Sequence, residues 1–201
     1  MVDPGWIVIL NGAPRSGKSS IARATQETLD GVWVNLGVDV MMAATPRRYL
    51  PGIGLRPGGE SPEVEALVPT LYAALYESVA AHSRLGLDVV VDVGHHDGYS
   101  KPLNIVADRD RRLKGLPVLC VGVRCPIDVI MARRAVDEVG RDGGYLQASQ
   151  TEAVPGPVAH WQSAVHECFD YDLGVDTSLL TPEDCAKLIG LALAGSGKPS
   201  G

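Results

Sequence analysis

The feature that most constrains the fold is the run GAPRSGKS at positions 12–19, close to the N-terminus. It has the spacing G-x-x-x-x-G-K-S. It lies between the apolar run Trp6–Leu10 and the segment Lys18–Leu29, whose apolar residues recur at helical intervals. Glycines let the backbone of such a loop curl, so that successive N–H groups point inward and bind an anion, and the positive end of the next helix adds to the attraction. The pattern therefore predicts a strand, a phosphate-binding loop and a helix, in that order.

Two side chains of this loop have specific predicted roles. Lys18 can reach the outer phosphates of a nucleoside triphosphate, and the Ser19 hydroxyl can bind a magnesium ion. We predict that the whole loop contacts the nucleotide, through Gly12, Ala13, Pro14, Arg15, Ser16, Gly17, Lys18, Ser19 and Ser20. A second G-S-G-K string near the C-terminus follows no strand-like run, and Pro199 blocks a helix after it, so residues 195–201 are predicted to be a flexible tail.

Strand-like and helix-like segments alternate along the rest of the chain. Further strands are predicted at 32–36, 87–93, 117–123 and 171–175, and helices at 62–85, 101–113, 127–136, 157–168 and 182–193. This alternation predicts an α/β fold with a five-stranded parallel sheet flanked by helices on both faces. A chain of 201 residues is long enough for one domain, which we predict over residues 1–194.

The composition narrows the class of protein. A net charge of −6 argues against nucleic acid as the main partner. No apolar stretch reaches the roughly 18 residues of a membrane span, and the N-terminus lacks the basic and apolar regions of a signal peptide. The four cysteines have no metal-ligand spacing, so we expect reduced thiols. A cytoplasmic protein that binds neither nucleic acid nor membranes is therefore expected.

Polar residues stand at the predicted carboxyl ends of the strands, where parallel sheets bind their ligands. Asp39, just past the second strand, can act as the general base for an acceptor hydroxyl, and the alternative is that it caps the following helix. Asp92, at the end of the third strand, is predicted to hold magnesium through water. Further contacts are predicted for the nucleotide, from Arg124 and Thr177, and for the acceptor, from Met41 and Met42.

Two adjacent histidines, His95 and His96, follow the third predicted strand. Neighbouring side chains in a loop point in different directions, so the pair indicates a solvated loop or acceptor contacts rather than a zinc site. The few aromatic residues near this edge could line an acceptor pocket, with core or surface positions as the alternative: Tyr49, Tyr72, Tyr99, Tyr145 and Trp161.

The pair Arg133 and Arg134, a glycine-containing segment and Arg141 are typical of a kinase lid, predicted near residues 133–148. A lid arginine neutralises charge on the transferring phosphate. Arg133 and Arg134 are therefore candidate catalytic residues, and Arg141 is a candidate acceptor contact. The alternative is a surface helix whose arginines pair with nearby acids.

Taken in order, these motifs resemble the chloramphenicol phosphotransferase family. The resemblance rests on ILNGAPRSGKSS, GVDVMM, VVVDV, VGVRC and VH…YDLGVDTS, and it covers roughly residues 6–194. It implies a P-loop kinase fold and transfer of a phosphoryl group from ATP to a hydroxyl of a small antibiotic. Together with the loop, it predicts a Mg²⁺-dependent phosphotransferase that uses ATP or GTP. It also implies that Asp39 is the base. The lid segment and residues 92–97 depart from the family pattern where an acceptor would bind, so a different hydroxylated antibiotic or a nucleoside stays open.

Two other functions remain open at this point. One is a housekeeping kinase for a nucleoside, a shikimate-like acid or a sugar acid. The other is a nucleotide-binding regulator with slow hydrolysis, against which the missing N-K-x-D guanine-reading motif argues.

Overall fold

The computed structural model describes residues 2–50, 62–96, 102–136, 154, 156–167 and 169–197. Five parallel strands form one sheet in the order β2-β3-β1-β4-β5. Their bounds are β1 Ile7–Asn11, β2 Trp33–Asn35, β3 Asp88–Val93, β4 Val118–Arg124 and β5 Leu173–Asp176. The predicted five-stranded parallel sheet is confirmed.

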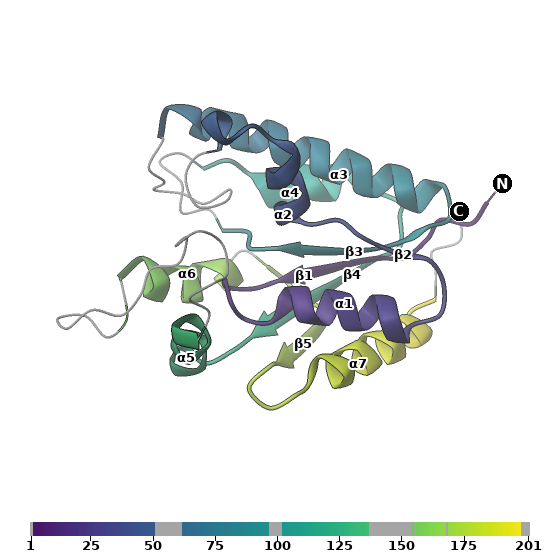
Figure 1. Cartoon of the computed structure of the whole chain (residues 1–201). Helices are drawn as coiled ribbons and strands as arrows, with labels where there is room; N and C mark the ends of the chain where they lie inside the picture. Colours follow the sequence, from purple (N-terminus) through teal and green to yellow (C-terminus); the bar gives the residue numbers. More distant parts are fainter. Residues whose placement is uncertain are drawn as a thin grey trace.

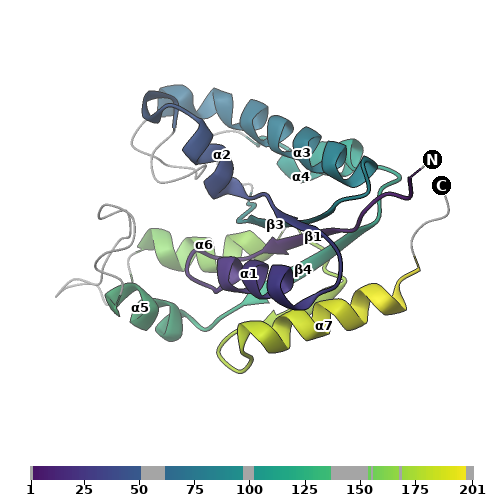
Figure 2. The same ribbon diagram turned by 45° about the vertical axis from the view of Figure 1, so that its right-hand side comes forward.

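Helices cover both faces of this sheet (Figures 1 and 2). On one face lie α3 (Val68–Arg84) and α4 (Ile105–Arg112), and on the other lie α1 (Lys18–Thr28) and α7 (Pro182–Gly195). The remaining helical elements are α2 Val38–Ala44, η1 Arg47–Tyr49, η2 Pro62–Leu67, α5 Ile127–Val136 and α6 Gly156–Glu167.

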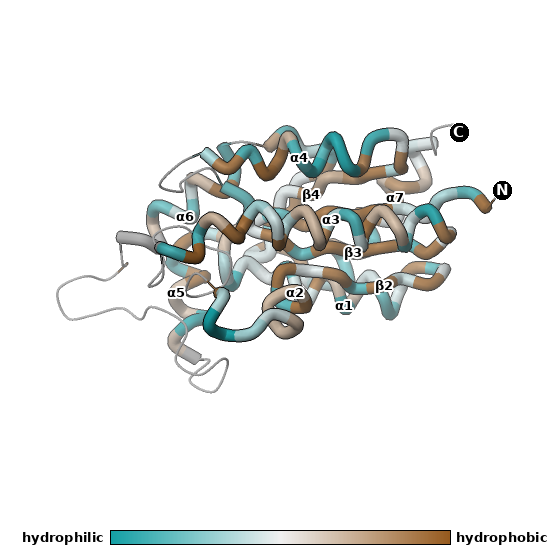
Figure 3. Tube along the Cα trace, turned by 90° about the horizontal axis from the view of Figure 1, so that it is seen from above, coloured by the Kyte–Doolittle hydropathy of each residue, from teal (hydrophilic) through white to brown (hydrophobic). Residues whose placement is uncertain are grey.

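The central strand β1 is buried along its whole length. Ile7 and Ile9 pack into the cluster under α3 and α4, whereas Val8 and Leu10 pack into the cluster under α1 and α7. Because side chains alternate between the faces of a strand, a strand covered on both sides needs apolar residues at every position. Figure 3 shows this pattern as brown stretches along the strands, while the helices alternate between brown and teal.

Two predicted helices begin later than expected. The segment 62–85 divides into η2 and α3, and Pro69 lies in the first turn of α3, where its missing N–H costs nothing. The segment 101–113 becomes helical only at Ile105, because Asn104 has a left-handed conformation with φ 52°. The start of α7 is as predicted: the Thr181 side chain accepts a hydrogen bond from the Asp184 N–H in a capping box.

Three of the predicted thiols, Cys120, Cys125 and Cys185, are free and buried. Within the described ranges, none of the helices combines the length and the apolar character needed to cross a membrane. Helix α7 ends at Gly195, just past the predicted domain boundary.

Candidate active site

The predicted strand, loop and helix are present in that order. Strand β1 ends at Asn11, the loop follows, and α1 begins at Lys18. Two glycines make the loop possible. A Cβ at Gly12 would lie 2.3 Å from the Val123 carbonyl oxygen, and Gly17 has φ 97°, which favours glycine. The loop therefore passes close to β4 and turns directly into the N-terminus of α1, as a phosphate-binding loop requires.

The Lys18 ammonium lies against the start of this loop. Its Nζ donates hydrogen bonds of 2.9 Å to the carbonyl oxygens of Gly12 and Ala13. This is the part of a P-loop where the lysine meets the β- and γ-phosphates. The side chain is thus directed back across the loop.

The two predicted magnesium residues meet across neighbouring elements. The Ser19 hydroxyl donates a 2.7 Å hydrogen bond to Oδ2 of Asp92, although the residues are 73 positions apart. Asp92 pairs with Leu10 in the register of β3 and β1, which brings its carboxylate beside the loop. Mg²⁺ usually takes one or two protein oxygens together with waters and substrate phosphates, so this hydroxyl–carboxylate pair fits the ion.

Gly37 leaves the space that the Asp92 carboxylate occupies. A Cβ at Gly37 would lie 1.8 Å from Asp92 Oδ1, far inside van der Waals contact. We expect Gly37→Ala to displace this carboxylate and to raise the Mg²⁺ concentration for half-maximal activity about 10–100-fold. A magnesium titration of the phosphoryl-transfer rate measures the effect. Gly174→Ala is the control, because a Cβ there meets nothing within 4 Å. An unchanged magnesium requirement in Gly37→Ala would contradict the assignment of Asp92.

Asp39 lies in the first turn of α2, two residues after Gly37, and is half-buried. The N-cap of α2 is Gly37 itself, so the interpretation of Asp39 as the helix cap is wrong. The positive end of a helix favours a carboxylate in its first turn. Its neighbours Met41 and Met42 are partly buried and pack against the core under α3 and α4. The acceptor roles of these three residues stay predictions.

His95 and His96 are buried, with exposed fractions of 1% and 4%, so the interpretation as a solvated loop is wrong. The His95 ring packs among Tyr72, Tyr76 and Phe169, and its Nε2 shares a short hydrogen bond with the Tyr76 hydroxyl. Burial and the nearby Arg109 and His96 hold the pKa of His95 well below its usual range. The imidazole is therefore neutral and belongs to an aromatic cluster. Among the described residues, no group of side chains could hold a metal in the manner of a zinc site.

Asn11 connects this cluster to the phosphate loop. It is fully buried; its Oδ1 accepts from the His95 N–H at 2.8 Å, and its Nδ2 donates to the Val165 carbonyl at 2.7 Å and the Tyr171 hydroxyl at 2.8 Å. One amide thus joins the ends of β1 and β3, helix α6 and the chain entering β5. In the sequence, this role of Asn11 is indicated by one feature alone, a polar residue at the end of an apolar strand.

His166 and Tyr171 belong to the last motif of the family resemblance, but sequence reasoning predicted no role for either, and the fold brings them to the same place. The Tyr171 hydroxyl lies 2.7 Å from Nδ1 of His166. Burial, followed by the positive charges of Arg124 and Lys18, lowers the pKa of His166 to about 4. At neutral pH the imidazole therefore adds no positive charge beside the phosphate loop. The two residues are close in the sequence, but Asn11, which donates to the Tyr171 hydroxyl, is 160 residues away, so the sequence alone does not place them beside the phosphate loop.

Arg133 connects α5 by hydrogen bonds to the phosphate loop and to the residue that follows β5. Its guanidinium donates to the Thr177 hydroxyl at 3.0 Å and to the Thr177 carbonyl at 2.7 Å. Arg15 donates in return to the Arg133 carbonyl at 2.9 Å. The Thr177 hydroxyl donates to the Ser16 carbonyl at 2.7 Å, and the Thr177 N–H donates to the Arg124 carbonyl at 3.0 Å. The predicted nucleotide contacts Arg124 and Thr177 therefore lie at the loop.

Of the other predicted lid residues, the structure describes Arg134 but not Arg141. Arg134 is completely buried, so the alternative of a surface helix is wrong for this side chain. Its catalytic role, like that of Arg133, stays a prediction. Arg141 and most of the predicted lid near 133–148 lie outside the described residues, as do Tyr99 and Tyr145. Of the other aromatic candidates, Tyr49 is exposed and Tyr72 is buried.

Comparison with known proteins decides the family. The family described as "Chloramphenicol phosphotransferase-like protein" matches residues 5–194. The chain belongs to this family. Its relatives include the "Putative O-phosphotransferase Rv2636" of Mycobacterium tuberculosis, 25% identical over 197 residues, which span 91% of this chain and 80% of that protein. The family resemblance inferred from the motifs is confirmed, and with it the prediction of a phosphotransferase enzyme.

Solved structures with the same fold include kinases and a resistance protein. A sugar kinase from Janibacter sp. has a TM-score of 0.61 with 19% identity, over 95% of each chain. The tunicamycin resistance protein of Deinococcus radiodurans has a TM-score of 0.60 with 20% identity, over 98% of this chain and 99% of that one. At these identities the likeness establishes the fold alone, and it agrees with the predicted P-loop kinase fold.

Proposed function

We propose that this family member transfers the γ-phosphoryl group of ATP or GTP to a hydroxyl of a small natural product, such as an antibiotic. The observation that carries the proposal is the grouping of Lys18, Ser19 and Asp92 at one edge of the sheet, with Asp39 two residues beyond Gly37. A nucleoside triphosphate is expected to bind residues 12–20 and to approach Arg124 and Thr177, because Thr177 bonds both Ser16 and Arg124. The reaction consumes a nucleoside triphosphate, which supports a cytoplasmic location.

In the proposed reaction the acceptor oxygen forms a bond to the γ-phosphorus while the bond from that phosphorus to the bridging oxygen breaks. The nucleoside diphosphate leaves with the bonding electrons, and Asp39 takes the proton of the acceptor hydroxyl. Lys18 and the backbone N–H groups of the loop stabilise the charge on the transferring group. Ser19 and Asp92 would hold Mg²⁺, which neutralises charge on the β- and γ-phosphates when bound. Arg133 can add positive charge from the α5 side.

A transfer screen tests this function. The purified protein is incubated with Mg²⁺ and either ATP or GTP, against hydroxylated antibiotics including chloramphenicol, nucleosides, shikimate and sugar acids. Mass spectrometry detects the gain of one phosphoryl group. We expect a product from a natural-product alcohol. A product from a metabolite alone would support the housekeeping kinase instead. Nucleotide binding without transfer to any hydroxyl would contradict the proposal.

A further inference from the structure

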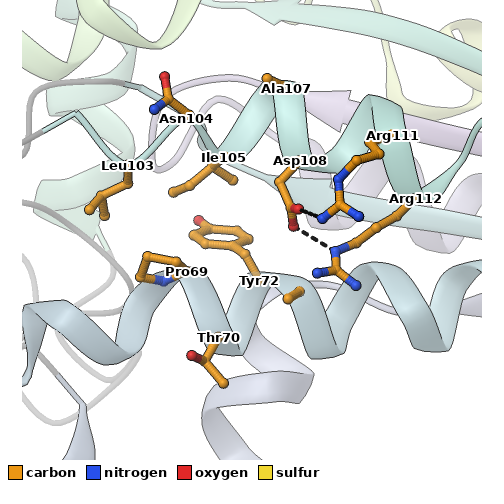
Figure 4. Close-up of a pocket in the computed structure, with 11 residues that line it drawn as sticks. Pro69, Thr70, Tyr72, Leu103, Asn104, Ile105, Ala107, Asp108, Arg111 and Arg112 are labelled. Carbon is orange, nitrogen blue, oxygen red and sulfur yellow. Dashed lines mark hydrogen bonds and ion pairs between the residues drawn. The ribbon is translucent and has the colours of Figure 1, made fainter.

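A cavity lies between α3 and α4, but it does not reach the phosphate loop. Its volume is about 710 Å³, and the ring of Tyr72 lies between the two helices (Figure 4). Among the described residues that line it, there is neither Asp39 nor any residue of the loop. The Tyr72 ring packs on buried His95, with 4.7 Å between the ring centroids, and the His95 N–H bonds Asn11 before the loop. A residue that touches the nucleotide from outside the loop must therefore come from an element other than α3 or α4.

Helix α6 lies directly against the phosphate loop. Val165 of α6 is buried in a small apolar cluster that includes Ala13 of the loop. The Val165 carbonyl also accepts a 2.7 Å hydrogen bond from Asn11, the residue before the loop. His166 is the next residue of α6 and is half-buried. Its imidazole is therefore held beside the loop and is still accessible to a ligand.

A chain of hydrogen bonds fixes the nitrogen through which His166 can donate. A backbone N–H can only donate, so the Asn11 atom that bonds the His95 N–H is the amide oxygen, and Nδ2 carries the two hydrogens. Nδ2 donates them to the Val165 carbonyl at 2.7 Å and to the Tyr171 oxygen at 2.8 Å. The Tyr171 hydroxyl lies 2.7 Å from Nδ1 of His166 but 3.3 Å from the Val165 carbonyl, which is long for an O–H donor. Tyr171 therefore donates to Nδ1, and the neutral imidazole carries its proton on Nε2.

The charges around His166 favour an anionic ligand. After burial, the groups that lower the pKa of this imidazole are the cations Arg124 and Lys18. The Lys18 ammonium bonds the carbonyls of Gly12 and Ala13, where the lysine of a P-loop meets the outer phosphates. A phosphate oxygen at this place is attracted by both cations, and the Nε2–H of the imidazole can donate to it.

We infer that His166 binds the γ-phosphate of the nucleotide through its Nε2–H, and that Asn11 and Tyr171 are positioning residues that hold this tautomer. The inference deepens the proposed function and rests on it for the nature of the ligand, a nucleoside triphosphate. Because the contact is to the last phosphate, it distinguishes a triphosphate from a diphosphate.

Two substitutions of His166 separate this role from a purely structural one. His166→Asn keeps an acceptor for the Tyr171 hydroxyl but is too short to place a donor where Nε2 lies. His166→Gln reaches that place with an N–H donor but no longer has an acceptor at the position of Nδ1. A γ-phosphate contact is therefore lost in the asparagine variant and kept in the glutamine variant, whereas a structural partner of Tyr171 has the opposite pattern.

Isothermal titration with Mg²⁺ and either ADP or a non-hydrolysable ATP analogue measures the contact without any transfer, and the matched guanine nucleotides are used if GTP is the donor. We expect His166→Asn to weaken binding of the triphosphate about tenfold and to leave the diphosphate affinity within about twofold, because one hydrogen bond to a charged group is lost. We expect His166→Gln to bind the triphosphate within about threefold of the wild type. His160→Asn is the control, because His160 is an exposed histidine on the same helix.

Long-range proton–nitrogen NMR spectra of the histidine rings test the tautomer in the protein alone. The signals of His166 are those that disappear in His166→Asn. We expect the neutral wild-type imidazole to carry its proton on Nε2. We expect Tyr171→Phe to give a mixture of the two tautomers and to weaken triphosphate binding about threefold, with the diphosphate affinity unchanged.

Three results would overturn the inference: a proton on Nδ1 of His166 in the wild-type protein, unchanged triphosphate affinity in His166→Asn, or an equal loss of diphosphate affinity in that variant. Each of them leaves the proposed function standing if the transfer screen yields a phosphorylated alcohol. A selective loss of triphosphate affinity in His166→Asn, without transfer to any hydroxyl by the wild type, would overturn the proposed function alone. A wild-type protein that binds no nucleotide would overturn both.

Discussion

Replacement of Asp39 by alanine is expected to slow phosphoryl transfer about 10²–10⁴-fold while nucleotide affinity stays within a few-fold of the wild type. Asp39 is half-buried in the first turn of α2, and Gly37 places that turn against the carboxylate of Asp92. Without a group to accept its proton, the acceptor hydroxyl is a poor nucleophile. The phosphates are bound by other residues, so nucleotide binding does not depend on this side chain.

Single-turnover transfer rates and nucleotide titrations separate the two effects. Asp39→Asn has nearly the same shape but cannot accept the proton, so it is expected to behave like alanine. Asp30→Ala is the matched control, because Asp30 is an exposed carboxylate outside the site. Turnover close to wild type in Asp39→Ala would show that this carboxylate is not the base.

The second large effect is expected for Lys18→Ala, which should weaken nucleotide binding and turnover together, with a combined loss in kcat/KM of at least about 10²-fold. The ammonium now bonds the Gly12 and Ala13 carbonyl oxygens at 2.9 Å. A phosphate oxygen at this position accepts a charge-assisted hydrogen bond from Lys18 when the nucleotide is bound, and this bond is stronger in the transition state. Its removal therefore affects both steps, unlike the loss of Asp39.

Isothermal titration with a non-hydrolysable ATP analogue, alongside steady-state kinetics, measures the two losses. Lys187→Ala controls for a change in net charge, since Lys187 is an exposed lysine on α7. A thermal unfolding curve confirms that Lys18→Ala is folded. Catalysis at the wild-type rate in this variant would mean that the loop does not bind the triphosphate.

The arrangement around the phosphate loop was largely predictable from the sequence. The spacing of Gly12, Gly17, Lys18 and Ser19 reflects a local requirement, because the loop must turn within a few residues between a strand and a helix. Asp92 was predictable for a related reason: it is a carboxylate in an apolar run, where an unpaired charge is costly to bury. The hydrogen bond from Ser19 supplies its partner.

The surroundings of this loop were less predictable. His95 and His96 follow a strand and have the composition of a solvated loop, but Tyr72, Tyr76 and Phe169 enclose His95 from other elements. The capping interpretation of Asp39 was wrong by two positions, because the N-cap of α2 is Gly37. Such outcomes depend on packing between segments that are far apart in the chain.

The sequence by itself determined the order of strands and helices, the parallel sheet and the nucleotide loop, because periodicity and glycine spacing are properties of contiguous residues. Only the tertiary structure decided which side chains meet. The amide of Asn11 joins four segments, including the distant Tyr171, and a cavity remains between α3 and α4. Each depends on the register of the sheet and on the distance between packed helices, which no short stretch of sequence specifies.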